Sequence, residues 1–370
     1  MKNNNGKIFI WIIVILVSIG VGSVGMYYGI RYFKPLSQTV VNKLEKEVTV
    51  NENGIADAVE KLYDAVVVVE SYQKGTLTSS GTGFVYKTDD KNAYILTNNH
   101  VISGATEVKV TFTNNQTETV KVVGSDEYTD IGLLSVAKDK VIKVAEIGKA
   151  EDTRLGDTAF VIGTPLGSEY SWTVTRGIIS GKDRLVEVNA SNSNVSSWVM
   201  KVLQTDAAIN SGNSGGPIAN SNGEVIGITN MKLISRGVEG MGFAIPIEDA
   251  TNKAEQIIKG ENVEYPYIGI AMIDVNKYYN SYQYGALIQS SGVTSGVIVN
   301  SVEKGSPAAK GKIEANDIIT KINDKEVKNV AYLRYYLYQH KVGDTIKVTV
   351  IRDGKNKELS VTLGTSKQTT

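Results

Sequence analysis

The sequence predicts a mainly β protein in three parts: an apolar N-terminal helix, two packed antiparallel β-barrels, and a small α+β domain. Three observations favour this architecture. Residues 8–30 contain no charged side chain, and residues 66–244 contain about a dozen short β-branched runs separated by Gly, Asn and Asp turns. A further set of expected strands, between residues 266 and 363, encloses one expected helix at 330–339.

Residues 8–30 predict a transmembrane signal anchor. Lys7 and Arg31 bracket this segment of 23 residues, and at about 1.5 Å per residue a helix of this length crosses a hydrocarbon core of about 30 Å. A cleaved signal peptide is the alternative, but no alanine precedes Ala56, so no A-x-A cleavage site exists. We expect residues 1–7 to be a cytoplasmic tail, residues 31–54 to be a linker, and the following domains to lie on the extracellular side.

The first folded domain is expected at residues 55–258. It begins with helical spacing at 55–63. Strands are then expected at 66–69, 83–86, 94–96, 108–112, 119–123, 133–136, 158–162, 171–179, 198–203, 224–228 and 242–244. Two antiparallel barrels account for this pattern, and a functional site is expected in the cleft between the two halves.

Composition excludes several function classes. Lysine plus arginine and aspartate plus glutamate number 39 each, so no overall field attracts nucleic acid. The absence of cysteine excludes disulfides, thiol catalysis and cysteine-ligated metals. The chain has two histidines, far apart in the sequence, so no metal site and no cofactor are expected.

The run Gly212-Asn213-Ser214-Gly215-Gly216-Pro217 predicts a reactive serine. A serine between glycines can lie on a tight turn, with its Oγ exposed and adjacent N–H groups directed at one point, as an oxyanion hole requires. Serine is a weak nucleophile, so it needs a histidine base and a carboxylate that orients the histidine.

Both partners precede this run. His100 ends the segment Thr97-Asn98-Asn99-His100, and Asp130 stands before the apolar run Ile131-Gly132-Leu133-Leu134. The order His100, Asp130, Ser214 is typical of the chymotrypsin-like class. Taken singly, each residue also fits a purely structural role: Ser214 in a surface turn, His100 as a hydrogen-bonded structural histidine, and Asp130 at the start of a strand. Together they indicate a serine protease.

Two other carboxylates are weaker candidates for the orienting role. Asp126 lies in the polar loop Gly124-Ser125-Asp126-Glu127 and is expected to be solvated. Asp206 is close in sequence to Ser214 and is expected to order that segment.

The segments Thr97–Ile102, Thr129–Leu134 and Thr205–Pro217 resemble the three catalytic blocks of the HtrA/Deg family, particularly its membrane-bound members from Gram-positive bacteria. The resemblance implies a trypsin-like (chymotrypsin-like) double β-barrel, a PDZ domain, a homotrimer, and ATP-independent proteolysis of misfolded or exported envelope proteins. It makes Ser214 the nucleophile, His100 the base and Asp130 the orienting carboxylate. It also implies an oxyanion hole formed by the N–H groups of Gly212, Asn213 and Ser214.

The resemblance also suggests a substrate pocket. Ile209, Leu233 and Ile234 match positions that line the S1 pocket in the family, and no acidic side chain is evident at its floor. A small or medium aliphatic P1 residue is therefore expected rather than lysine or arginine.

The C-terminal segment is expected to be a PDZ domain at residues 262–364, followed by a polar tail at 365–370. Gly305-Ser306-Pro307-Ala308-Ala309 and Asn316-Asp317-Ile318-Ile319 resemble the bacterial PDZ pattern. By resemblance, Tyr267, Ile268, Gly269 and Ile270 would bind a peptide C-terminal carboxylate while the peptide adds a strand. From the residues alone, an apolar strand with a packing glycine is an equal alternative. The second histidine, His340, is expected to have a structural role at a helix C-terminus.

A non-catalytic, PDZ-based holdase or sensor on a protease fold is the alternative function. The presence of all three of Ser214, His100 and Asp130 argues against it, because a binding protein does not need them together.

Overall fold

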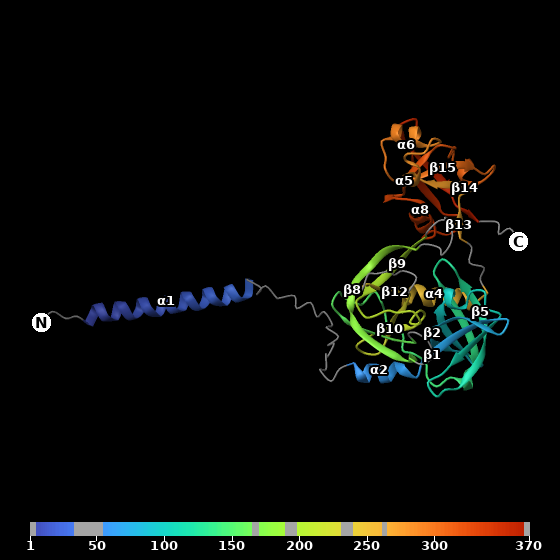
Figure 1. Cartoon of the computed structure of the whole chain (residues 1–370). Coiled ribbons are helices and arrows are strands. Elements are labelled where there is room, and N and C mark those ends of the chain that lie inside the picture. The colour runs from blue at the N-terminus through green and yellow to red at the C-terminus, as the bar shows by residue number, and fades with distance from the viewer. Residues whose placement is uncertain are drawn as a thin grey trace. The chain divides into compact units, whose positions relative to one another are not determined.

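The computed structural model describes residues 5–32, 55–164, 170–188, 198–230, 240–260 and 265–365. The chain divides into two compact units, Met1–Asn51 and Glu52–Thr370. The first unit contains helix α1 (Asn5–Tyr32) (Figure 1). Residues Ile10–Gly29 of α1 have a mean hydropathy of 2.2 and are long and apolar enough to cross a membrane, a description that a signal sequence also meets.

The second unit begins with helix α2 (Ala56–Tyr63) and a closed six-stranded barrel. The barrel order is β1-β2-β3-β6-β5-β4, and all pairs are antiparallel. Its strands are β1 (Val66–Gln73), β2 (Thr76–Thr88), β3 (Asn92–Asn98), β4 (Glu107–Thr111), β5 (Thr117–Asp126) and β6 (Ile131–Ala137). The short helix α3 (Asn99–Ile102) follows β3 directly and contacts β1, β2, β3 and β6, and η1 (Lys138–Lys140) follows β6.

A second closed barrel follows, with the order β10-β11-β12-β9-β8-β7. Its strands are β7 (Thr158–Gly163), β8 (Thr173–Val188), β9 (Trp198–Thr205), β10 (Pro217–Asn220), β11 (Val225–Thr229) and β12 (Gly242–Pro246). Strands β2 and β8 are longer than the apolar runs that predict them, because polar and exposed residues continue the hydrogen-bonded ladder beyond the buried part.

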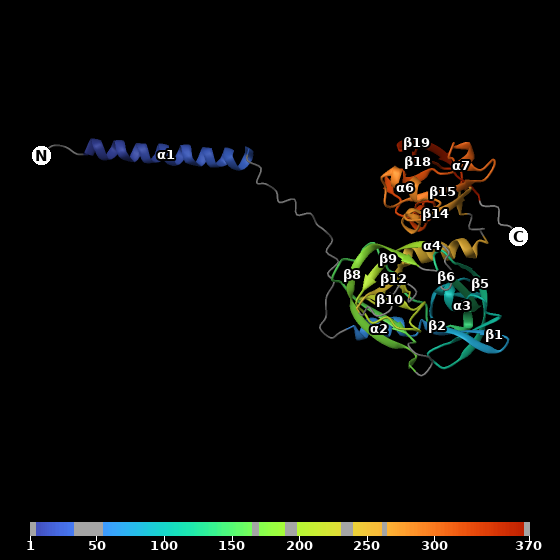
Figure 2. The same ribbon diagram turned by 45° about the horizontal axis from the view of Figure 1, so that its top comes forward.

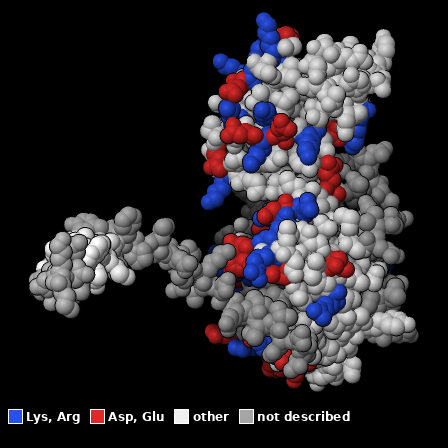
Figure 3. All heavy atoms as spheres, turned by 90° about the vertical axis from the view of Figure 1, so that its left-hand side faces the viewer, with Lys and Arg blue, Asp and Glu red and all other residues white. Residues whose placement is uncertain are grey.

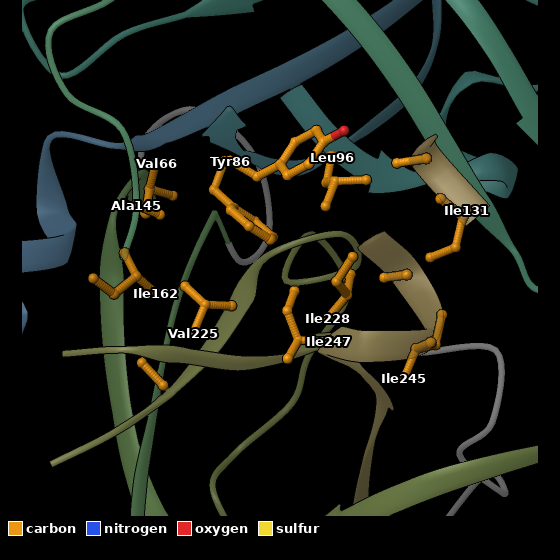
Figure 4. Close-up of a cluster of buried hydrophobic side chains, with 14 of the residues drawn as sticks. Val66, Tyr86, Leu96, Ile131, Ala145, Ile162, Val225, Ile228, Ile245 and Ile247 are labelled. Carbon is orange, nitrogen blue, oxygen red and sulfur yellow. The ribbon is translucent and has the colours of Figure 1, made fainter. Parts of the chain in front are cut away.

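The two barrels share an apolar core. Figure 4 shows side chains from both barrels and from the following helix directed into one cluster, among them Val66, Tyr86, Leu96, Ile131, Ile162, Val225, Ile228, Ile245 and Ile247. Full burial of each large aliphatic side chain contributes roughly 1.5–3 kcal/mol. Helix α4 (Ile247–Ile258), visible in Figure 2, contacts β5 and β6 of the first barrel and β11 and β12 of the second. The barrels are therefore joined by a continuous core rather than by a flexible connection.

The C-terminal domain is an antiparallel sheet with short helices. The sheet has the order β14-β15-β16-β18-β19, with β17 paired to β16, and β13 pairs with β20. The strands are β13 (Pro266–Tyr267), β14 (Ile270–Asp274), β15 (Val297–Val302), β16 (Ile318–Ile322), β17 (Lys325–Glu326), β18 (Thr345–Arg352), β19 (Lys355–Thr362) and β20 (Gly364–Thr365). The helices are α5 (Val275–Tyr278), α6 (Gly285–Ser291), α7 (Pro307–Lys310) and α8 (Val330–Leu337).

Local chemistry explains two of the C-terminal motifs. Ser306 caps α7, its Oγ accepting the Ala309 N–H at 3.2 Å, and Pro307 occupies the first helical position, where its missing N–H costs nothing. Asn316 has φ +71°, which asparagine tolerates better than most residues, so the expected turn forms without glycine.

The predicted fold class is confirmed: two six-stranded barrels are followed by a small sheet domain with its own core, and an apolar helix lies at the N-terminal end. Positive and negative side chains are interspersed over the face in Figure 3, in keeping with the balance of 39 basic and 39 acidic residues.

Candidate active site

The Asp130 carboxylate is buried, 1% exposed, just before β6. Its Oδ2 lies 2.6 Å from His100 Nδ1 and accepts a hydrogen bond from Asn230 Nδ2 at 2.8 Å. Its Oδ1 accepts the His100 backbone N–H at 2.9 Å. An ionised carboxylate only accepts hydrogen bonds, so this contact keeps the proton of a neutral His100 ring on Nδ1 and leaves Nε2 as the basic nitrogen.

The backbone of Asp130 is held in an unusual conformation. Its φ is +54°, in the left-handed region, which costs a residue other than glycine about 1–2 kcal/mol. The Asp130 carbonyl accepts hydrogen bonds from the Asn99 N–H at 3.0 Å and from Asn98 Nδ2 at 3.1 Å. The segment that carries His100 therefore fixes both the carboxylate and the backbone of Asp130.

Asn230 belongs to this site although the sequence analysis did not identify it. It directly follows β11 of the second barrel, is fully buried, and donates its N–H to the Phe243 carbonyl at 3.0 Å. Its amide reaches Asp130, 100 positions earlier in the chain and in the first barrel. The sequence signal was weak: an amide side chain immediately after an apolar strand.

Ser214 lies between β9 and β10 of the second barrel and is 4% exposed. The first barrel holds its segment. The Thr82 N–H donates to the Ser214 carbonyl at 2.9 Å, and Thr82 Oγ1 donates to the Gly212 carbonyl at 2.7 Å. Ser214 is thus fixed to β2, while His100 and Asp130 lie at the end of β3 and the start of β6 in the same barrel.

Steric crowding explains why the residue after Ser214 is glycine. Gly215 has φ +85°, and a Cβ there would lie 2.2 Å from the Thr82 carbonyl oxygen and 2.4 Å from Thr97 Oγ1. No side chain fits against these atoms, so the G-N-S-G-G pattern reflects close backbone contact between the barrels.

The three N–H groups expected to face a substrate oxygen are not equivalent. The Asn213 N–H donates to the Asn210 carbonyl at 3.0 Å, within the turn itself. The Asn213 side chain is buried against β7, where a Cβ on Gly163 would lie 2.4 Å from Asn213 Oδ1. Gly212 has φ +99°, which sets the direction of the turn before Ser214.

Of the expected S1 residues, Ile209 is 9% exposed and packs in the interior cluster of the second barrel. A Cβ on Gly242 would lie 2.5 Å from Ile209 Cγ1, so β12 approaches this side chain closely. Leu233 and Ile234 lie outside the described residues.

The two rival carboxylates have structural partners. Asp206 Oδ1 accepts the Ile178 N–H at 2.6 Å, which fixes the start of the Ser214 segment to β8. The expectation that Asp126 is solvated is wrong: it is 7% exposed, because the following turn folds over it and Tyr265 covers it.

In the C-terminal domain, the segment before β14 is shaped by Gly269. Its φ is +80°, and a Cβ there would lie 2.3 Å from Ser306 Cβ. The carbonyls of Ile268 and Gly269 accept hydrogen bonds from the N–H groups of Ala308 and Glu303, at 2.8 and 3.0 Å. Tyr267 donates its hydroxyl to Glu303, and Ile270 opens β14. Strand β14 pairs only with β15 in the described sheet.

In the described part of the chain, His340, the second histidine, contacts residues of the C-terminal domain and not the candidate catalytic residues. It follows α8, and its Nδ1 lies 3.8 Å from Asp344 Oδ2 while its Nε2 lies 3.4 Å from Asn323 Nδ2. Both contacts are within the C-terminal domain.

The family of trypsin-like peptidase domains matches residues 81–228, and the PDZ domain family matches residues 266–363. Serine protease Do-like HtrB of Bacillus subtilis (strain 168) is 41% identical over 335 residues, covering 86% of this chain and 72% of that protein. Serine protease Do-like HtrA of Lactococcus lactis subsp. cremoris (strain MG1363) is 37% identical over 359 residues, covering 89% and 87%.

Solved structures give the same result. The crystal structure of the serine endoprotease from Yersinia pestis superposes with a TM-score of 0.61 at 30% identity, covering 84% of this chain and 98% of that chain. The HtrA-type protease AlgW with decapeptide gives a TM-score of 0.64 at 27% identity, covering 84% and 98%.

Two closed barrels with a histidine–aspartate pair and a serine loop, followed by a PDZ domain, define a trypsin-like serine endopeptidase with one PDZ domain. With relatives at this identity over most of its length, the chain belongs to the HtrA family of serine proteases.

Replacing Asn230 should lower peptidase activity without unfolding the protein. Asn230→Ala removes one of the donors to the buried Asp130 carboxylate, and hydrogen bonds to charged groups contribute about 1.5–3 kcal/mol. We expect kcat on a short peptide to fall by roughly 10- to 100-fold. Asn222→Ala, in an exposed turn of the same barrel, is the matched control and should remain within twofold of wild type. Equal activity of the two variants would contradict a role for the Asn230 amide.

Proposed function

We propose that Ser214, His100 and Asp130 form the catalytic triad of this endopeptidase. The distance of 2.6 Å between His100 Nδ1 and Asp130 Oδ2 carries the proposal, because it fixes the ring with Nε2 as the base. Ser214 Oγ attacks the scissile carbonyl carbon while its proton passes to Nε2, and the C=O electron pair moves to oxygen. The imidazolium, stabilised by Asp130, then protonates the leaving amine as the C–N bond breaks, and water hydrolyses the acyl-enzyme by the same path.

The oxyanion donors are assigned to the turn of Gly212, Asn213 and Ser214. Backbone N–H groups directed at the developing charge are worth several kcal/mol in a site shielded from water. In this conformation the Asn213 N–H is occupied by Asn210, so its use requires the turn to open.

Ile209, with Leu233 and Ile234, is proposed to line an apolar S1 pocket that prefers aliphatic P1 residues. The natural substrates are proposed to be misfolded or exported envelope proteins. Hydrolysis requires no nucleotide in this mechanism. Cleavage of unfolded casein without added nucleotide tests the preference for unfolded substrates. A set of peptides that differ at P1 tests the pocket, and faster cleavage after lysine or arginine would contradict its assignment.

Ser214→Ala should abolish casein degradation by the full chain in detergent. Loss of a triad member commonly lowers the rate by ~10⁴-fold or more. Ser211→Ala, three positions earlier and exposed, is the matched control and should remain near wild type. The chain is proposed to form a homotrimer, and both variants should have the mass of a trimer by light scattering, because neither substitution removes an apolar side chain from a barrel core.

Activity of Ser214→Ala within tenfold of wild type would exclude Ser214 as the nucleophile. A wild-type chain that binds unfolded casein without cleaving it would favour the alternative, a PDZ-based holdase. A monomer in solution would contradict the proposed trimer.

The PDZ domain is proposed to bind peptide C-termini at residues 267–270. Strand β14 is an edge strand, so a peptide can add to its unpaired side. In the described part of the chain, the N–H groups of Ile268 and Gly269 donate no backbone hydrogen bond, which leaves them available to a carboxylate.

A peptide with a free apolar C-terminus should therefore bind at least about tenfold more tightly than its C-terminal amide, since charge-assisted hydrogen bonds are lost in the amide. Gly269→Ala should weaken binding of the acid, because the new Cβ meets Ser306. Gly292→Ala introduces a side chain at a similar φ, +72°, in open space and is the matched control. Fluorescence anisotropy measures all four cases, and equal binding of acid and amide would contradict the assignment.

Helix α1 is proposed to anchor the chain in the cell membrane, with residues 1–7 in the cytoplasm and both folded domains outside. The chain has no cysteine, so single reporters have no background. Leu155→Cys, at a position 67% exposed, should react with an impermeant maleimide on intact cells, whereas Asn4→Cys should react only after lysis. The reverse pattern would invert the orientation, and release of a shortened chain would indicate a cleaved signal sequence.

A further inference from the structure

Three tyrosines from three segments meet beside the turn that carries Asp130. Tyr128 lies in that turn, between β5 and β6; Tyr265 lies between α4 and β13; and Tyr338 caps the C-terminal end of α8 in the PDZ domain. The ring centroids are 4.7 Å apart for Tyr128 and Tyr265, 5.1 Å for Tyr128 and Tyr338, and 4.4 Å for Tyr265 and Tyr338. We call this group the tyrosine cluster.

The tyrosine cluster is bonded to the turn through Asp126. The Tyr265 hydroxyl donates to Asp126 Oδ1 at 2.5 Å. Asp126 Oδ2 accepts the backbone N–H of Thr129 at 2.8 Å and Thr129 Oγ1 at 2.5 Å. These hydrogen bonds join the segment leading to the PDZ domain to Thr129, the residue that directly precedes Asp130.

Burial makes these bonds effective. Burial, reinforced by the nearby Asp126 charge, raises the pKa of Tyr265 well above its usual range, so the phenol remains a donor at any pH at which the protein works. Lys253 of α4 lies 4.0 Å from Asp126 Oδ2 and 3.4 Å from the Tyr265 hydroxyl, which compensates the buried carboxylate.

The turn needs such support because Asp130 is in the left-handed conformation, with φ +54°. A strained residue persists only where surrounding contacts over-determine it. Asp130 itself is held by the segment of His100 and by Asn230, and the Asp126 carboxylate fixes residues 126–129 directly before it. The contacts of Asp126 are therefore the restraint on the part of the turn that the other two do not reach.

We propose that Asp126 and Tyr265 are positioning residues for Asp130, and that contact of PDZ residue Tyr338 with the tyrosine cluster sets the alignment of the Asp130–His100 pair. The inference rests on the proposed triad. It makes the position of the PDZ domain a determinant of the base itself, separate from any recruitment of substrate through the peptide-binding segment.

The test uses the full chain in detergent and a short peptide substrate without a free apolar C-terminus, so that PDZ recruitment plays no part. Tyr265→Phe keeps the ring and removes only the hydroxyl, Tyr338→Ala removes the ring, and Tyr338→Phe restores the ring. Tyr94→Phe is the matched control. Tyr94 lies six residues before His100 and also donates its hydroxyl to a carboxylate, that of Asp89, at 2.8 Å.

We expect Tyr265→Phe and Tyr338→Ala to lower kcat by about 5- to 50-fold with KM within twofold. The acid limb of their pH–rate profiles should move to lower pH, because a less well placed carboxylate stabilises the imidazolium less. Tyr338→Phe should recover most of the kcat that Tyr338→Ala loses, and Tyr94→Phe should match wild type in kcat and in pH profile.

Wild-type kcat and an unmoved pH profile in Tyr265→Phe would overturn the proposal, and so would an effect on KM alone. A defect in Tyr265→Phe with none in Tyr338→Ala would overturn the part that concerns the PDZ domain. Ser214→Ala, measured beside these variants, separates the two levels: if it remains active the triad fails, and if it is inactive while Tyr265→Phe is normal, only the positioning role fails.

Discussion

The buried carboxylate of Asp130 is the group on which the rest of the structure depends. A carboxylate removed from water is tolerated only when donors replace its hydration. The structure supplies these donors from two places: the His100 segment at the end of β3, and Asn230 after β11 in the other barrel. The carboxylate is therefore fully coordinated only when both barrels are in contact, which couples the folding of the protease domain to the geometry of its candidate base.

The same reciprocity holds at Ser214. Its segment belongs to the second barrel, but Thr82 of the first barrel bonds the carbonyls on either side of Asn213. Each barrel thus holds the functional segment of the other, and the large apolar core between them supplies the rigidity that these hydrogen bonds need. Each hydrogen bond contributes only about 1 kcal/mol, so these bonds alone would not hold the two barrels together. Apolar burial holds them together, and the polar contacts set how the Ser214 segment is aligned with β2.

Sequence patterns were sufficient to predict the fold class. Runs of β-branched residues and the turn residues between them are local signals of strands, and two closed barrels bury the apolar side of those strands. The patterns also predict His100, Asp130 and Ser214 as catalytic candidates, because that chemistry depends on residue type, and the structure places His100 and Asp130 in contact. They did not predict the contacts of Asn230 and Asp126, which join distant segments of the chain. Nothing near Asp126 in the sequence indicates that Tyr265, 139 positions later, covers it, so a polar loop predicted a solvated charge where the structure has a buried one. The S1 assignments of Leu233 and Ile234 remain predictions.

The contact between the PDZ and protease domains has a composition suited to reversible docking. Ala331 and Tyr332 of α8 are buried against Val199 of β9, and Asn329 Nδ2 donates to Glu187 Oε1 at 3.0 Å. Each domain keeps its own apolar core, so separation would expose mainly tyrosine rings and polar groups rather than aliphatic core. Interfaces of this kind within a chain permit relative motion. Because β9 leads to the Ser214 segment and the tyrosine cluster adjoins the Asp130 turn, this interface borders the segments that carry both halves of the candidate site.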